Sequence, residues 1–210
     1  MAHRFNTRSQ DLRQWLAQEA ARILAEEGVQ DFLLAKRKAA ERLGLPANGH
    51  SLPTNREIEA AVAEHHRLFH GITQPARLHV LRATAVQAMK LFAPFEPRLT
   101  GPVLSGTATR HAGVQLHLFT DSAEQVATHL LERDIPFESG DKRLRSVAGQ
   151  LHQYPAFCFM AGDVEIEAVV FPFDAIREAP ASPLDGKPMK RAALREVEVL
   201  LAEDEMDRPG

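Results

Sequence analysis

Hydrophobic and polar residues alternate strictly over residues 114–119, which is the pattern of a half-buried strand. Successive strand side chains take opposite sides, so Gln115 and His117 share one side with Phe119. The apolar side carries Val114, Leu116 and Leu118. Residues 164–171 alternate in the same way and place Glu165 and Glu167 together. The two stretches predict strands of one mixed sheet, with any chemistry on its polar side.

Apolar residues recur at helical spacing along the first part of the chain, which predicts a run of helices. These predicted helices cover residues 9–27, 30–43, 56–70 and 75–92. Ser9 is expected to cap the first helix and Gly28 to end it. Residues 46–53 are typical of a loop, and Thr54 or Asn55 is expected to cap the third helix.

The remainder of the chain mixes strands with helices. Further strands are predicted over residues 98–104, 135–138, 142–147 and 156–160, and further helices over residues 123–134 and 190–202. Residues 139–141 are expected to turn a hairpin. The predicted class is α+β, with three parts. They are a helical N-terminal region (1–74), a mixed-sheet core (75–180) and a linker with a C-terminal helix (181–210).

Composition is that of an ordinary globular protein of one or two small domains, with 44% hydrophobic and 25% charged residues. No secretory signal or membrane-length apolar run is present, so a cytoplasmic location without a membrane partner is expected. The single cysteine, Cys158, excludes an internal disulfide. Its apolar neighbours indicate a buried thiol rather than a nucleophile.

The densest basic run lies in the second predicted helix. Lys38 and Arg42 are four residues apart and share a helix face, with Lys36 close by. Such a helix can bind nucleic acid phosphates, or it can be a solvated surface. The net charge of −3 gives no support to nucleic acid binding by the whole chain.

Three segments around the first alternating strand carry a family pattern. They are Gly101-Pro102, Gly106-Thr107-Ala108 and Ala112-Gly113-Val114-Gln115-Leu116. Their order and spacing resemble the signature of the nucleotidyltransferase superfamily, which has the DNA polymerase beta-like fold. In that family Gly-Ser ends one strand and Ser-Asp-x-Asp lies on the next. The resemblance implies a nucleotidyltransferase-like core.

The same resemblance implies that the usual chemistry is missing. The family transfers a nucleotidyl group with two Mg²⁺ ions on clustered carboxylates. Gly113 and Gln115 stand where the two aspartates are expected, and Glu167 is the candidate for the third carboxylate. With two of three carboxylates missing, the resemblance favours the fold over the activity. Mg²⁺ would be required only if catalysis survives.

Candidate site residues follow from the resemblance and from the polar side of the strands. Glu167, Gln115 and His117 are the candidates for catalysis or metal binding, and the alternative is a solvated sheet face. Backbone N–H groups of a loop can cradle a phosphate. The candidates for a nucleotide or phosphate site are Gly101, Ser105, Gly106, Thr107 and Arg110. Lys187, Lys190 and Arg191 are either a further anion contact or a basic linker.

The whole chain is also similar to a group of bacterial nucleotidyltransferase-like proteins. They share the Ala-Lys-Arg-Lys-Ala helix and the Ser-Pro-x-Asp-Gly-Lys-Pro-Met segment at residues 182–189. This second resemblance brings no established activity. The first hypothesis is a nucleotide-binding, phosphate-binding or regulatory module with a degenerate active site. The rivals are an active metal-dependent transferase with a rearranged site and an RNA- or ribosome-associated factor that uses the basic helix.

Overall fold

The computed structural model describes residues 2–29, 31–45, 52–69 and 73–206. The chain forms two compact units, and each is described separately. The helical unit comprises Met1–Gln74 with the short segments Thr107–Ala112 and Pro183–Asp185. The sheet unit comprises the rest of the chain. The α+β class predicted from the sequence is confirmed.

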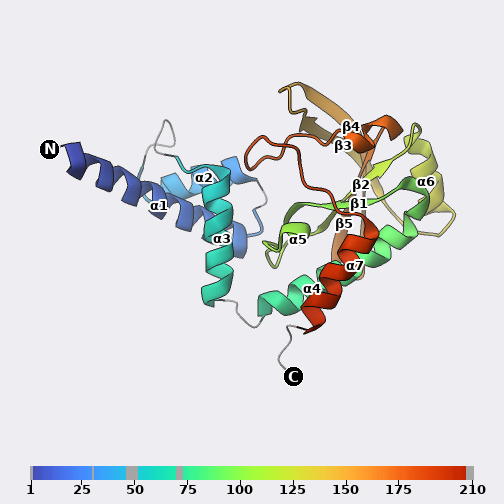
Figure 1. Ribbon diagram of the computed structural model, residues 1–210, viewed down its shortest axis with the longest axis horizontal. Coiled ribbons are helices and arrows are strands. Elements are labelled where there is room, and N and C mark those ends of the chain that lie inside the picture. The colour runs from blue at the N-terminus through green and yellow to red at the C-terminus, as the bar shows by residue number, and fades with distance from the viewer. Residues whose placement is uncertain (1, 30, 46–51, 70–72, 207–210) are drawn as a thin grey trace. The chain divides into compact units, whose positions relative to one another are not determined.

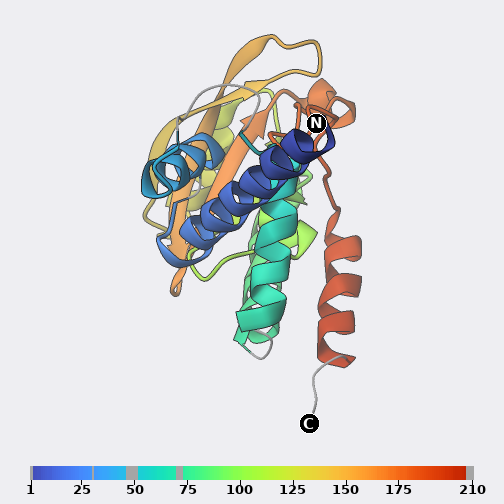
Figure 2. The same ribbon diagram turned by 90° about the vertical axis from the view of Figure 1, so that its left-hand side faces the viewer.

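Three helices form the helical unit: α1 (Ala2–Glu26), α2 (Phe32–Arg42) and α3 (Asn55–Phe69). Both α2 and α3 pack on α1 (Figures 1 and 2). Small residues let the helices approach closely, and the fully buried side chains include Ala20, Ile23, Ala39 and Ile58. Most of the predicted loop 46–53 lies outside the described residues.

The ends of these helices follow their capping residues, with one exception. The predicted N-cap at Ser9 is wrong, because α1 already begins at Ala2, and no Gly or Pro interrupts the chain between the two. Gly28 follows α1 with a φ of 71°, which is left-handed backbone that glycine adopts without strain. The Asp31 carboxylate accepts a hydrogen bond from the backbone N–H of Leu34 at 2.7 Å and caps α2.

Helix α3 starts with a capping box, which confirms Thr54 as its cap. The Thr54 backbone N–H donates to the Glu57 carboxylate at 2.6 Å, and the Glu57 N–H donates to the Thr54 hydroxyl at 3.2 Å. Arg13 of α1 also donates to the Glu57 carboxylate, at 2.8 to 3.0 Å. The pKa of Glu57 is lowered to about 2, chiefly by the hydrogen bond from Arg13 and further by Thr54.

The sheet unit contains five strands in the order β1-β2-β5-β4-β3. Their bounds are β1 Arg98–Thr100, β2 Val114–Phe119, β3 Glu138–Arg145, β4 Leu151–Ala161 and β5 Val164–Phe171. The pair β2 and β5 is parallel, and the other neighbours are antiparallel. The prediction that the two alternating stretches share one mixed sheet is confirmed.

Helices and short 3₁₀ turns complete this unit. They are α4 Thr73–Leu91, η1 Ala93–Phe95, α5 Gly101–Ser105, α6 Ala123–Leu131, η2 Phe173–Arg177 and α7 Leu194–Met206. Helices α4 and α6 bury apolar side chains beside one face of the sheet, where the Phe92 and Phe159 ring centroids are 5.8 Å apart. Helix α7 is joined to α4 by the ion pair of Arg82 with Asp204, at 2.7 Å.

Two strand predictions are wrong, each because of a misjudged turn. The strand predicted over residues 98–104 ends at Thr100, because Gly101 is left-handed with a φ of 74° and Pro102 then starts α5. The hairpin predicted around residues 139–141 does not form. Gly140 instead continues β3 and pairs with Ala156 of β4. The predicted helix 190–202 begins later, at Leu194, and runs to Met206.

We expect Glu57→Gln to lower the free energy of unfolding by about 0.5 kcal/mol at pH 7, because glutamine keeps the capping box but loses the partly exposed ion pair with Arg13. The lowered pKa makes this stabilisation complete above the ordinary value of 4.5 and reduces it as the pH falls toward about 2. Urea unfolding of both proteins from pH 7 down to pH 2 measures the difference. A difference that stays constant over this range contradicts the assignment, and Glu41→Gln is the exposed control.

Candidate functional site

One side of the sheet, which we call the polar face, collects the predicted catalytic residues. The parallel pairing sets Gln115 of β2 opposite Glu167 of β5, and Cys158 of β4 lies opposite Glu167 on its other side. His117 and Glu165 lie two residues away on the same face. The structure thus brings Gln115, His117 and Glu167 onto one surface.

The Glu167 carboxylate is held by a lysine. Lys142 of β3 places its Nζ at 2.6 Å from one carboxylate oxygen and 2.8 Å from the other. The two side chains are 40% and 23% exposed, so water screens the pair only partly. The one acid at a position that the resemblance assigns to a metal ligand therefore already has a cation bound to it.

The two positions without a carboxylate are closely packed. A Cβ added to Gly113 would lie 2.7 Å from the backbone carbonyl oxygen of Glu165, which is closer than real Cβ atoms come. A Cβ added to Gly101 would lie 2.3 Å from the Gln115 Oε1, so the Gln115 amide covers the Gly101 backbone. An aspartate cannot replace Gly113 without moving β5 away from β2.

His117 is buried, with only 3% of its surface exposed. Its Nδ1 accepts a hydrogen bond from the Arg191 Nε at 2.9 Å, and its ring centroid is 4.5 Å from that of Phe171. Burial lowers the pKa of His117 to about 3, and the charges of Arg191 and Lys142 lower it further. His117 is therefore neutral at pH 7 and too weak a base to take a proton from a substrate.

These residues do not fit a pair of magnesium ions. Mg²⁺ prefers anionic oxygen ligands in octahedral geometry. Gly113 offers no ligand, Gln115 offers a neutral amide oxygen, and Glu167 is paired with Lys142. Within the described ranges, no three side chains of His, Cys, Asp or Glu are grouped so that they could hold a metal ion.

The five predicted phosphate-binding residues are divided between the two units. Gly101, Ser105 and Gly106 bound α5 in the sheet unit, whereas Thr107 and Arg110 belong to the helical unit. The Ser105 hydroxyl donates to the Pro102 carbonyl at 3.4 Å, and Gly106 ends α5 with a φ of 80°. These glycines and the serine thus have roles in shaping the turn after β1.

Thr107 and Arg110 have partners inside the helical unit. The Thr107 hydroxyl donates to Glu59 at 3.3 Å. The Arg110 Nε donates to His111 Nε2 at 2.9 Å, and its Nη2 donates to the Glu26 carbonyl. These contacts hold the segment Thr107–Ala112 to α1 and α3.

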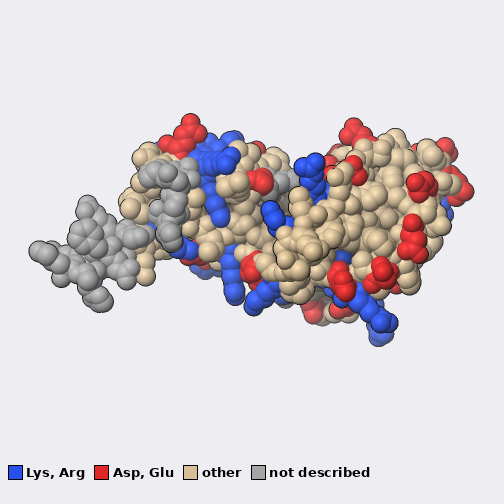
Figure 3. All heavy atoms as spheres, turned by 90° about the horizontal axis from the view of Figure 1, so that it is seen from above, with Lys and Arg blue, Asp and Glu red and all other residues tan. Residues whose placement is uncertain are grey.

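Two of the three candidate nucleic-acid residues on α2 pair with acids on α1 or directly after it. Arg42 lies 2.6 Å from Glu27 and 3.1 Å from Glu19, and Lys38 lies 3.5 Å from Glu27. Lys36 is partly buried, and this burial lowers its pKa. Basic and acidic side chains are interspersed over the helical unit on the face shown in Figure 3. Pairing within the unit reduces the charge that these cations can offer to a phosphate backbone.

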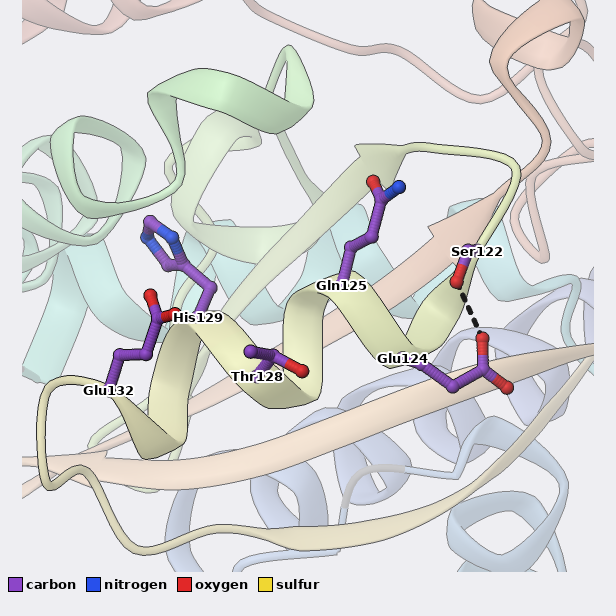
Figure 4. Close-up of a pocket in the computed structure, with 6 residues that line it drawn as sticks. All are labelled: Ser122, Glu124, Gln125, Thr128, His129 and Glu132. Atoms are coloured by element: carbon purple, nitrogen blue, oxygen red, sulfur yellow. Dashed lines mark hydrogen bonds between the residues drawn. The ribbon is translucent and has the colours of Figure 1, made fainter.

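A shallow hollow lies along α6, away from the polar face. It is lined by Ser122, Glu124, Gln125, Thr128, His129 and Glu132, all from one helix and its cap (Figure 4). His129 bonds through its Nε2 to the Leu91 carbonyl at 2.8 Å, and the Ser122 hydroxyl donates to Glu124 at 2.6 Å. The hollow is open, and its Ser122, Glu124 and His129 side chains already have hydrogen-bond partners, so we assign it no chemistry.

The most informative residue of the polar face is one that the sequence left undecided. Arg191 had been expected to be an anion contact or part of a basic linker, and the structure places its guanidinium against His117. The contact of Lys142 with Glu167 likewise depends on the pairing of β3 with β4. The sequence signal for Arg191 was its place in a short basic run, which says nothing about a partner 74 residues away.

Comparisons with known proteins found no matching family model, no matching curated protein and no matching solved structure. Among the described helices, none is both long enough and apolar enough to cross a membrane.

We expect Gly113→Ala to lower the free energy of unfolding by roughly 1–3 kcal/mol, because the added methyl group meets the Glu165 carbonyl in a packed sheet. Gly140→Ala is the matched control, since a Cβ at Gly140 meets nothing within 4 Å. Its effect should stay within about 0.5 kcal/mol. Equal stability of the two variants in chemical denaturation would show that β2 and β5 are not this close.

Proposed function

We propose that this protein is a nucleotidyltransferase-like binding module that does not transfer nucleotidyl groups. It binds a phosphate-bearing ligand, with a nucleotide as the first candidate, on the polar face and without a metal ion. The observation that supports this most directly is the ion pair of Lys142 with Glu167, at 2.6 Å. Lys142 forms an ion pair with the carboxylate that a metal-dependent enzyme of this kind would need as a ligand.

Charge explains why an anion is favoured over Mg²⁺. Lys142 cancels the charge of Glu167, and His117 is neutral. Arg191 adds a positive charge that has no carboxylate partner among the described residues. Glu165 is exposed and lies at the start of β5, away from His117. The end of the polar face around His117 therefore attracts anions, and two Mg²⁺ ions would add to a positive charge there.

The rival activity, transfer by a rearranged metal site, requires Glu167 as a ligand. Glu167 would have to be released from Lys142 before it could bind Mg²⁺, and its neighbour Gln115 on β2 offers only a neutral amide oxygen. The third hypothesis, RNA binding through α2, has less support because Lys38 and Arg42 pair with Glu27, the residue that follows α1. The two hypotheses become alternative outcomes of the experiment.

The test measures the melting temperature of the protein with ATP, CTP, GTP and UTP in EDTA. We expect at least one nucleotide to raise the melting temperature, because binding to the folded state alone stabilises it. Glu167→Gln should bind as well as the wild type or better, since it removes a negative charge and frees Lys142. Release of pyrophosphate from a nucleoside triphosphate should be absent.

Three results would contradict the proposal. The first is no shift with any nucleotide. The second is pyrophosphate release that requires Mg²⁺ and is lost in Glu167→Gln, which would establish the transferase. The third is salt-sensitive RNA binding, without nucleotide binding, that is lost when Lys36, Lys38 and Arg42 are replaced. Glu165→Gln removes a neighbouring acid that Lys142 does not hold and is the control for Glu167→Gln.

A further inference from the structure

Arg191 fastens the C-terminal segment to the polar face. Backbone hydrogen bonds of 2.9 Å in both directions join Ala192 to Leu99 of β1, and the Thr100 hydroxyl donates to the Lys190 carbonyl. These bonds fix the backbone on both sides of Arg191. The side chain then reaches over the sheet, where its Nε donates to His117 Nδ1 at 2.9 Å.

The guanidinium of Arg191 contacts carbonyl oxygens and aromatic rings. Its Nη1 donates to the carbonyl oxygens of Ala175 at 3.0 Å and Glu178 at 3.4 Å. Its Cζ lies 5.0 Å from the Phe119 ring centroid and 4.9 Å from that of Phe171. The described residues provide no carboxylate within ion-pair distance of it. The charge is thus stabilised by dipoles and ring faces alone.

One nitrogen of this guanidinium makes no hydrogen bond. The Nη2 is buried and has no partner in the part of the chain that the structure describes. Burial of a cation without a counter-charge is unfavourable, and it lowers the pKa of Arg191 to about 10. Tyr154 acts against this lowering, and the nearby charge of Arg98 adds to it. An anion placed at Nη2 would supply both the missing acceptor and the missing charge.

We propose that Arg191 is the anchor for a phosphoryl group of the ligand, which its Nη2 binds on the polar face. This inference rests on the proposed function and names the residue that performs it. A guanidinium suits a phosphoryl group because its N–H donors form a fixed fork. The half-buried ring of Tyr154, 4.3 Å from Phe171 between centroids, gives the ligand an aromatic surface beside the charge.

Access to Nη2 requires a local movement. Segment 173–178 contains η2 and accepts hydrogen bonds from the Arg191 Nη1 at the Ala175 and Glu178 carbonyls, so it is the segment that we expect to move. Ala175 and Ile176 also pack on the aromatic cluster of Phe119 and Phe171. Ligand binding should therefore change the hydrogen exchange of this segment, and that change can be observed in the unmodified protein.

The experiment measures the dissociation constant of pyrophosphate, and then of ATP, by calorimetry at constant ionic strength in EDTA. Arg191→Met should weaken binding roughly tenfold or more, because it removes a charge-assisted hydrogen bond. Arg191→Lys should lie between this variant and the wild type, since it keeps the charge but not the fork. Arg143→Met, which removes an exposed arginine of β3, should bind as the wild type does.

The outcomes separate this inference from the proposed function. If the wild type binds neither pyrophosphate nor any nucleotide, both are wrong. If the wild type binds and Arg191→Met binds equally well, the role of Arg191 is wrong and the proposed function stands. If the Arg191 variants do not fold, hydrogen exchange of the wild type decides. Pyrophosphate should alter exchange in segments 173–178 and 190–192, and unchanged exchange there overturns the inference.

Discussion

The parallel pairing of β2 with β5 determines which side chains meet on the polar face. Its register sets Gln115 opposite Glu167 and His117 opposite Val169, and it brings Gly113 against the Glu165 backbone. A shift of one residue would turn every one of these side chains to the other face. The buried apolar residues of both strands on the helix-covered side prevent such a shift, since none of them could be exposed without loss of the core.

Given this register, the chemistry of the face follows from which charges lie around it. A two-metal enzyme needs several acids with no competing cation. Here the central acid is paired with Lys142, one neighbouring position is a glycine in close contact, and the histidine is kept neutral by burial and by Arg191. Under the proposed function, cations of the chain itself take the place of the metal ions that a transferase binds from solution. We therefore propose that this surface holds an anion and does not activate it.

The sequence predicted the strands and helices whose pattern is local. The alternation of 114–119 and 164–171 was sufficient to predict two strands of one sheet, and Gly28 and Thr54 marked helix ends correctly. The prediction failed where a residue typical of turns lies inside a paired strand. Gly140 resembles a turn residue, but it lies within the edge strand β3 and pairs with Ala156 of β4. Because the hairpin was predicted in the wrong place, the contact of Lys142 with Glu167 could not be predicted. The contact of Arg191 with His117 depends on the path of a whole proline-rich segment, which no local pattern reveals.

The dependence of ATP affinity on Mg²⁺ tests the central claim most directly. The claim is that fixed cations of the chain replace bound metal ions on the polar face. Calorimetric titration of the protein with ATP, first in EDTA and then at rising Mg²⁺, gives the sign of this dependence. We predict that affinity stays constant or falls as Mg²⁺ rises, because Mg²⁺ neutralises the charge that Lys142 and Arg191 attract. Affinity that rises with Mg²⁺ would contradict the account.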